Sequence, residues 1–181
     1  MTKARDLANA GTALTTVSAT ELGYLDGVTS FIQTQMDTKA PSTSPTLTSP
    51  IVVSPEERTT VSATAATGTV DFDALTQGVL YYTTDASANW TLNVRGSSGA
   101  TLDSILTTGD AITVSFLVTN GATAYYQTAF NIDGSAVTPK YSGGTAPASG
   151  NASAIDVYTY TIVKTASATY TVFGAGPIKY A

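Results

Sequence analysis

The chain has 181 residues, enough for one ordinary domain and a tail. Only 12% of the residues are charged, and the net charge of −5 argues against nucleic-acid binding, which requires a basic surface. Cysteine and histidine are both absent, which excludes disulfides, thiolate metal sites and histidine-based catalysis, so we expect no cofactor, no metal and no enzyme activity.

The rest of the composition favours β-structure. Threonine alone outnumbers all charged residues together, and threonine, valine and tyrosine suit a pleated surface. So few charges also indicate that other subunits cover part of the surface. We find no apolar run of the roughly 18–20 residues that cross a membrane. Met1-Thr-Lys-Ala-Arg5 is not followed by an apolar segment, so we expect synthesis in a cytoplasm without export by a signal peptide.

Residues 1–17 are small and polar, with isolated Leu and Val residues. They are expected to be extended or loosely ordered. Two interpretations stay open for this segment: a peptide that attaches the protein to a larger particle, or a frayed terminus.

Residues 18–39 are predicted to form a short helix. Ser18 followed by Glu21 matches a capping box, and Gly27 is expected to end a first turn before a second helical piece begins. A helix of about a dozen residues is marginal alone in water, so its apolar stripe needs a partner. Either the same helix of other chains packs around a three-fold axis, or the helix packs on its own β-domain. The predicted seam residues are Leu25, Val28, Ile32 and Met36.

Residues 40–56 form a proline-rich neck, with Pro41, Pro45, Pro50 and Pro55 at nearly even spacing. Each proline fixes φ and removes a backbone donor, which excludes regular helix and central strand. The segment is either a neck wrapped about a trimer axis or a semi-rigid linker. We expect the apolar residues 51–53 to be buried.

From residue 57 to 181, short strands alternate with turn signals every eight to twelve residues, which is typical of a β-sandwich or barrel. Asn120-Gly121 and Asp133-Gly134 are the strongest predicted hairpin turns, because both pairs tolerate positive φ. The predicted strands are Thr59–Thr64, Gly68–Phe72, Val79–Thr83, Asn89–Arg95, Ala111–Thr119, Tyr125–Ile132, Ala136–Tyr141, Asp156–Lys164, Thr169–Phe173 and Ile178–Tyr180.

One short helix is expected at Thr101–Leu106, and residues 142–153 form the longest loop. Many strands with one helix predict a mainly β fold with a jelly-roll-like sandwich head. The whole chain is then divided into an N-terminal segment at 1–17, a helix at 18–39, a neck at 40–56 and a head at 57–181.

The sequence offers little chemistry for catalysis. Asp71 and Asp73 place two carboxylates on one face of a strand end, as in a metal site or a glycosidase pair, but a solvated strand terminus explains them better. The segment Arg95-Gly-Ser-Ser-Gly-Ala100 lacks the spacing of a phosphate-binding loop and is interpreted as a turn.

Aromatic residues are the remaining candidates. In each of the pairs Tyr81-Tyr82 and Tyr125-Tyr126 one ring must point away from the core, because successive side chains of a strand alternate. Such rings either stack on sugars or fill the core and a subunit seam, where a tyrosine hydroxyl finds a partner. The predicted receptor or glycan contacts are Tyr82, Trp90, Tyr126, Lys140 and Tyr141.

The N-terminal part also resembles a known family. The run Glu-Leu-Gly-Tyr-Leu-Asp-Gly-Val-Thr-Ser from Glu21, followed by Ile-Gln-Thr-Gln from Ile32, is similar to a segment that recurs in tail-fibre proteins of tailed bacteriophages. The run from Lys39 to Thr48 resembles the one that often follows it. The similarity spans roughly residues 3–50 and implies a trimerisation element leading into a β-rich shaft or tip.

Taken with the β-rich head, this resemblance implies a homotrimeric virion fibre. We expect its head to adhere to a host-surface glycan or lipopolysaccharide, and its N-terminal segment to contact other virion proteins of the tail, baseplate or capsid. An alternative is a structural head, neck or baseplate fibre, or a capsid decoration protein, with no receptor role.

Overall fold

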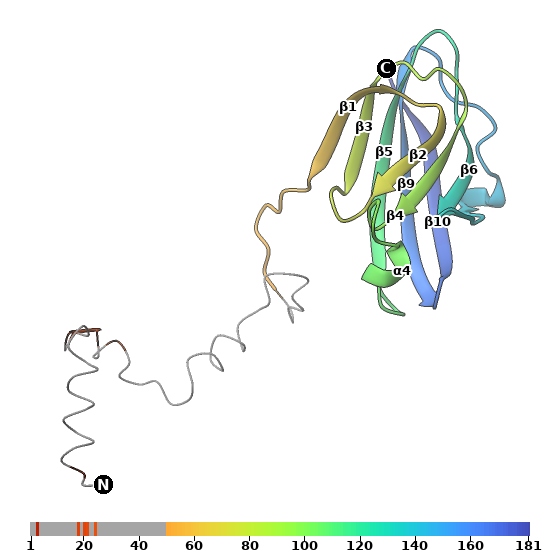
Figure 1. The fold of residues 1–181 in the computed structure, drawn as a ribbon. Helices are drawn as coiled ribbons and strands as arrows, with labels where there is room; N and C mark the ends of the chain where they lie inside the picture. The colour runs from red at the N-terminus through yellow and green to blue at the C-terminus, as the bar shows by residue number, and fades with distance from the viewer. Residues whose placement is uncertain (1–2, 4–17, 19, 22–23, 25–49) are drawn as a thin grey trace. The chain divides into compact units, whose positions relative to one another are not determined.

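The computed structural model describes Lys3, Ser18, Thr20, Glu21, Tyr24 and residues 50–181, of which Ser54–Ala181 form one compact unit (Figure 1). The seam residues Leu25, Val28, Ile32 and Met36 lie outside the described residues, as do most of the predicted N-terminal segment and neck.

The capping box at Ser18 is present. The backbone N–H of Ser18 donates to Glu21 Oε2 at 2.7 Å, and the backbone N–H of Glu21 donates to Ser18 Oγ at 3.2 Å. The backbone N–H and the hydroxyl of Ser18 both donate to Glu21 Oε2, and these two hydrogen bonds hold the pKa of Glu21 below its usual value. The hydrogen bonds of the predicted capping box are therefore formed, while most of the helix predicted for residues 18–39 lies outside the described residues.

Residues 50–55 have no regular secondary structure. Ile51, Val52 and Val53 are 94%, 62% and 84% exposed. The expectation that these three side chains are buried is wrong for the single chain, because three adjacent apolar residues do not by themselves supply a surface to pack on.

The strands and helices of the head follow one another closely along the chain. They are β1 (Thr59–Ala65), β2 (Gly68–Asp73), β3 (Val79–Thr84), β4 (Trp90–Arg95), α4 (Leu102–Ile105), β5 (Ala111–Asn120), β6 (Gln127–Ile132), β7 (Ser135–Ala136), β8 (Lys140–Tyr141), the 3₁₀ turn η1 (Ser142–Gly144), β9 (Ala154–Ala166) and β10 (Thr169–Tyr180).

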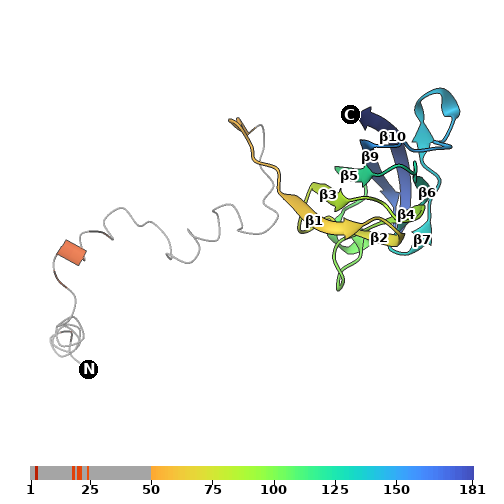
Figure 2. The same cartoon turned by 90° about the horizontal axis from the view of Figure 1, so that it is seen from above.

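The strands form two packed sheets, which Figure 2 shows as two layers. The six-stranded sheet has the order β1-β3-β5-β9-β10-β8, and the four-stranded sheet has the order β2-β4-β6-β7. From β1 to β6 the chain alternates between the two sheets. The predicted β-sandwich is thus confirmed.

The sandwich is not a jelly roll, so that part of the prediction is wrong. A jelly roll is built from antiparallel strands. Here the pairs β1–β3, β3–β5, β2–β4 and β4–β6 are all parallel. Parallel neighbours need a crossover connection, and each crossover here is a strand of the opposite sheet instead of the usual helix.

Most predicted strands lie close to where they are expected. The strand predicted for Tyr125–Ile132 begins only at Gln127, so the alternation predicted for Tyr125 and Tyr126 does not apply. Two further differences have local causes. The predicted strand Ala136–Tyr141 is divided into β7 and β8, with Pro139 between them, because proline cannot donate to a ladder. The predicted strands Thr169–Phe173 and Ile178–Tyr180 are one strand, β10, whose register against β9 shifts between Ala175 and Ile178.

Of the two predicted hairpin turns, only one forms. Asp133 and Gly134 adopt φ of 51° and 79° and connect β6 to β7. Asn120 instead ends β5 with 2% exposure, and its Nδ2 donates to Asp156 Oδ2 and to the carbonyl of Tyr125. A buried partner outside the turn overrides the local preference, and the chain continues into the other sheet.

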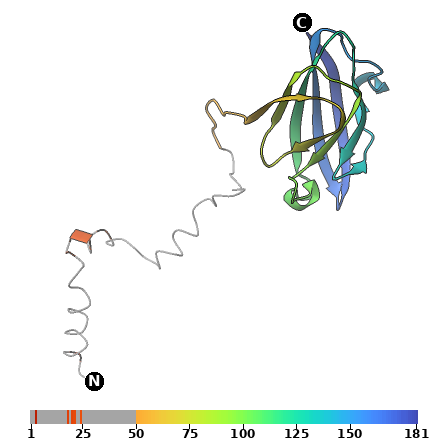
Figure 3. The same cartoon turned by 45° about the horizontal axis from the view of Figure 1, so that its top comes forward.

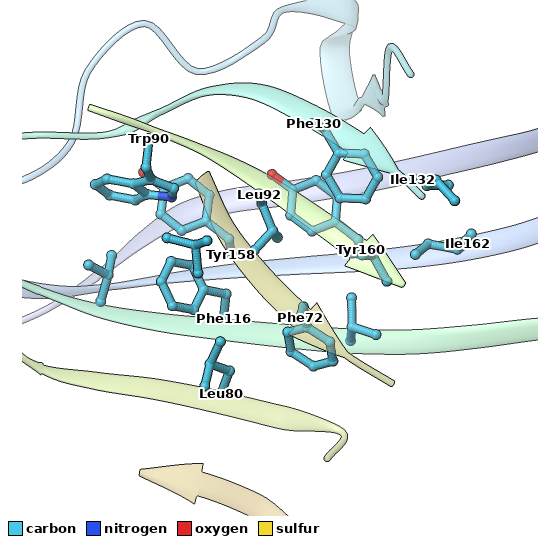
Figure 4. Packing of buried hydrophobic residues seen from close by; sticks show 14 of the residues in the cluster. Phe72, Leu80, Trp90, Leu92, Phe116, Phe130, Ile132, Tyr158, Tyr160 and Ile162 are labelled. Atoms are coloured by element: carbon cyan, nitrogen blue, oxygen red, sulfur yellow. The ribbon is translucent and has the colours of Figure 1, made fainter. Parts of the chain in front are cut away.

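The core lies between the sheets and is built from large side chains of both (Figure 4). Trp90 packs edge-on against Phe116 and Tyr158, with ring centroids 6.0 and 5.9 Å away. Phe130 packs against Tyr160 at 4.5 Å. Burial raises the pKa of Tyr158 and of Tyr160 above the usual value of 10.0, so both rings stay protonated at neutral pH.

The helix α4 lies at one end of the sandwich and the C-terminus at the other (Figure 3). Thr101 caps α4 by accepting a hydrogen bond from the backbone N–H of Ser104. The ammonium of Lys164, which is 6% exposed, contacts Asp103 Oδ1 at 2.7 Å and donates to the carbonyls of Asp103 and Leu106. These contacts of Lys164 therefore hold α4 against the end of β9.

The ion pair between Lys164 and Asp103 predicts that the head is less stable in acid. Hydrogen bonding to Lys164 is the largest cause that lowers the pKa of Asp103 from its ordinary value of 3.8. The folded state then binds fewer protons than the unfolded state, so the contribution is present above pH 3.8 and is lost as pH falls through the folded pKa. Urea unfolding of the parent and of Lys164→Met between pH 6 and 3 should show a smaller pH dependence in the variant. An equal dependence in both would contradict the assignment.

Candidate functional site

A pocket of about 270 Å³ lies beside β6 and the segment that follows it. Most of its wall is apolar, with a few polar groups among the apolar ones, which is typical of small-ligand sites. Its lining residues are Gln127, Thr128, Ala129, Phe130, Ala136, Val137, Thr138, Pro139, Tyr141, Ala146 and Pro147. We call it the Tyr141 pocket.

The chain path explains why a pocket forms here. After the turn at Asp133-Gly134, β7 pairs with β6 in the four-stranded sheet. The chain then crosses to the other sheet, where β8 pairs with β10. The crossing residues span the side of the sandwich, and Ala146 and Pro147 of the following loop complete the wall.

Gln127 supplies the most unusual polar group of the Tyr141 pocket. Its side chain is 6% exposed, and its Oε1 has no hydrogen-bond partner among the described residues. Its backbone N–H donates to the hydroxyl of Tyr158 at 3.5 Å. A buried amide oxygen without a partner costs about 1–3 kcal/mol. The oxygen is closed off from solvent in this conformation, so a ligand hydroxyl donating to Oε1 would offset that cost only after the Gln127 side chain turns toward the pocket.

Tyr141 forms another part of the wall, and Gly174 makes room for it. The hydroxyls of Tyr141 and Tyr160 lie 3.4 Å apart and share a hydrogen bond. A Cβ at position 174 would stand 2.7 Å from Cε1 of Tyr141 and 2.8 Å from Cε1 of Tyr160. The missing side chain of Gly174 thus allows both rings to lie against the backbone of β10.

Of the five predicted contact residues, only Tyr141 lines this pocket. Lys140 is exposed beside it, and Tyr126 is half-buried just before Gln127. Tyr82 is half-buried and packs edge-on against Phe116 at 5.3 Å, which leaves Tyr81 on the opposite face of β3. The structure therefore separates Tyr82 from the pocket.

The prediction that Trp90 contacts a receptor is wrong. Its side chain is 1% exposed and lies in the core. The cause is the pleat of β4, which turns Trp90, Leu92 and Val94 to one face, and that face meets the six-stranded sheet.

Gln127 was not identified from the sequence. It stands between Tyr126 and Thr128 without any motif. The only signal in the sequence is a polar residue near the start of a predicted strand. Recognising that it faces inward requires knowing which face of the strand is buried, and the sequence does not give this.

A second pocket, of about 410 Å³, lies at the end of the four-stranded sheet and is lined by Arg95, Asn93, Asp133 and the loop 97–101. The guanidinium of Arg95 pairs with Asp71 at 2.8 Å and with Asp73 at 2.7 Å. The hydrogen bond that Arg95 Nε donates to Asp73 Oδ1 is the largest cause that raises the pKa of Arg95.

These ion pairs argue against a metal site or a glycosidase pair formed by Asp71 and Asp73. Both carboxylates bind one cation of the same chain, and Asp71 also accepts from Asn93 Nδ2 at 2.7 Å. The arrangement is a compensated ion-pair cluster on the outer face of a sheet. The solvated strand terminus is the better description.

The part of the chain that the structure describes contains no group of three or more acidic residues arranged to hold a metal ion. None of its helices is long and apolar enough to cross a membrane. Comparisons of the whole chain with family models, with curated proteins and with solved structures found no match.

Proposed function

We propose that this protein is a homotrimeric virion fibre protein whose β head binds a host-surface glycan, with the Tyr141 pocket as the contact site. The observation that carries the proposal is a mostly apolar pocket lined by the Tyr141 ring and by Gln127, whose buried Oε1 has no hydrogen-bond partner among the described residues. The resemblance of residues 3–50 to phage tail-fibre segments supports the fibre and its virion location.

The chemistry of the pocket fits a sugar. A sugar ring has apolar C–H faces that pack on a tyrosine ring or a proline, and hydroxyls that donate to an amide oxygen. Tyr141 and Pro147 supply the apolar surface, and Thr128 and Thr138 add hydroxyls. Gln127 supplies the acceptor once its side chain turns toward the sugar. The volume of about 270 Å³ is below the usual range for drug-sized ligands, so the pocket suits a small group such as the end of a glycan.

Weak binding per site is sufficient in a trimer. Linking binding modules raises the overall affinity by about 10²–10⁴-fold without new contacts. We therefore expect residues 1–17 to attach the fibre to other virion proteins, residues 18–39 to trimerise, and the head to bind without catalysing a reaction.

The test is binding of the full chain to arrays of bacterial lipopolysaccharide and capsular oligosaccharides. Gln127→Ala should weaken binding about ten-fold or more, because the ligand loses one buried hydrogen bond. Tyr141→Ala should weaken it similarly, while Tyr141→Phe keeps the ring and should retain most of the binding. Thr123→Ala, on an exposed loop outside the pocket, is the matched control.

The glycan-binding experiment also distinguishes the adhesion role from the purely structural role. Failure of the parent chain to bind any glycan or susceptible host cell would favour the structural fibre or decoration role. Binding that survives Gln127→Ala and Tyr141→Ala would place the receptor contact elsewhere on the head.

A further inference from the structure

The outer face of the six-stranded sheet carries a continuous apolar row. Each of five neighbouring strands contributes one residue to this row. The strand register pairs each of these residues with the row residue on the adjacent strand, so all five side chains lie on the same face of the sheet. The row crosses β1, β3, β5, β9 and β10 through Val61, Tyr81, Leu117, Val157 and Ile178. Val61 is 62% exposed and Ile178 is 47% exposed in the single chain.

The neighbouring rows on this face are uncharged as well. On one side the row consists of Thr119, Ile155 and Tyr180, and on the other of Val79, Ser115, Thr159 and Ala175. We call the outward-facing residues of β1, β3, β5, β9 and β10 the neutral face.

The charged residues of these strands lie elsewhere. Asp156 and Lys164 of β9 are buried between the sheets. Lys179 pairs with Asp156 and so lies on the inner side of β10. Lys140 pairs with Phe173 and marks the margin of the neutral face, on β8.

The opposite outer face is different in character. Asp71, Asp73 and Arg95 lie on the outside of the four-stranded sheet, together with Asn93. Charged side chains on a sheet are typical of a surface that stays in water. One face of the sandwich is therefore suited to solvent and the other is not.

The exposed apolar residues of the head are concentrated on the neutral face. Within Ser54–Ala181 five large apolar side chains are well exposed, and Leu75 is the one outside this face. The others are Val61, Phe173, Ile178 and Tyr180, with exposed fractions of 62%, 51%, 47% and 58%. Contiguous exposed apolar surface of this kind marks an interaction site.

We infer that the neutral face packs against the same face of a second copy of this chain. A face that meets itself forms a two-fold contact, so the inference goes beyond the three-fold homotrimer of the proposed function and depends neither on it nor on glycan binding. Copies with a net charge of −5 repel one another least when they meet through an uncharged surface. An uncharged face is complementary to itself, and its burial leaves no unpaired charge. A partner of different sequence would instead be expected to match charges.

The size of the face fits such a contact. Five strands about 4.8 Å apart and about seven residues long at about 3.3 Å each cover roughly 550 Å² per copy. Two such faces together give about 1,100 Å², which passes the roughly 1,000 Å² that a specific interface needs.

The test uses the absence of cysteine from the chain. Ile178→Cys in the full-length protein should give cross-linked dimers with a short bismaleimide, because the side chains of neighbouring copies meet on the neutral face. Leu75→Cys is the matched control, since Leu75 is exposed at 59% outside the face. We expect at least about ten-fold more cross-linked product from Ile178→Cys, because the reaction occurs within an assembly.

Two further variants keep the test decisive. Val61→Cys should behave like Ile178→Cys, so a folding defect at one position does not decide the result. Adding Val61→Glu to Ile178→Cys should reduce cross-linking, because the acidic groups of neighbouring copies repel. Equal cross-linking of Ile178→Cys, Val61→Cys and Leu75→Cys would overturn the inference. Glycan binding is measured separately, so its failure is distinguishable.

Discussion

Replacing Trp90 with alanine is expected to destabilise the head by about 3–5 kcal/mol, the usual cost of removing a large aromatic side chain from a core. The ring is 1% exposed and packs edge-on against Phe116 and Tyr158, from β5 and β9. The substitution leaves a cavity that two sheets would have to move together to fill. Denaturant unfolding monitored by circular dichroism measures the effect.

A second substitution at this position separates packing from hydrogen bonding. The indole Nε1 is buried and has no hydrogen-bond partner among the described residues. Trp90→Phe keeps most of the packing and loses no hydrogen bond, so it should cost much less than Trp90→Ala. Leu75→Ala, at an exposed position, is the control. An unfolding free energy for Trp90→Ala within about 0.5 kcal/mol of the parent value would place the ring at the surface.

Replacing Asp156 with alanine should have the second large effect. Its carboxylate is 0% exposed and accepts from Asn120 Nδ2 at 3.0 Å, and from the backbone N–H and Nδ2 of Asn151 at 2.9 and 2.7 Å. Hydrogen bonds to a charged group contribute about 1.5–3 kcal/mol each, and the orphaned donors stay buried. We expect a net loss of about 3 kcal/mol.

The structural consequence should be local to one loop. Asp156 joins the end of β5 to Asn151, at the end of the loop 142–153. Asp156→Ala should therefore expose this loop to proteinase K and weaken glycan binding, since Ala146 and Pro147 line the Tyr141 pocket. Glu56→Ala removes one exposed carboxylate and controls for net charge. Unchanged protease resistance of the loop would refute this role.

The local structure of the head was predictable from the sequence, because strands and tight turns depend on neighbouring residues. The alternation in β5 and β9, the helix start at Thr101 and the turn at Asp133-Gly134 all follow from side-chain periodicity and backbone preference. Tyr141 was identified from its place beside a long loop, and it lines the Tyr141 pocket.

The tertiary structure alone decided which strands are neighbours and which face of each is buried. Periodicity assigns Trp90, Leu92 and Val94 to one face of β4 but cannot say that this face meets the core. The parallel order β1-β3-β5 joins strands that are distant in sequence. The buried Gln127 and the neutral face arise from the same long-range pairing. These properties depend on contacts between residues far apart in the chain, which no local pattern encodes.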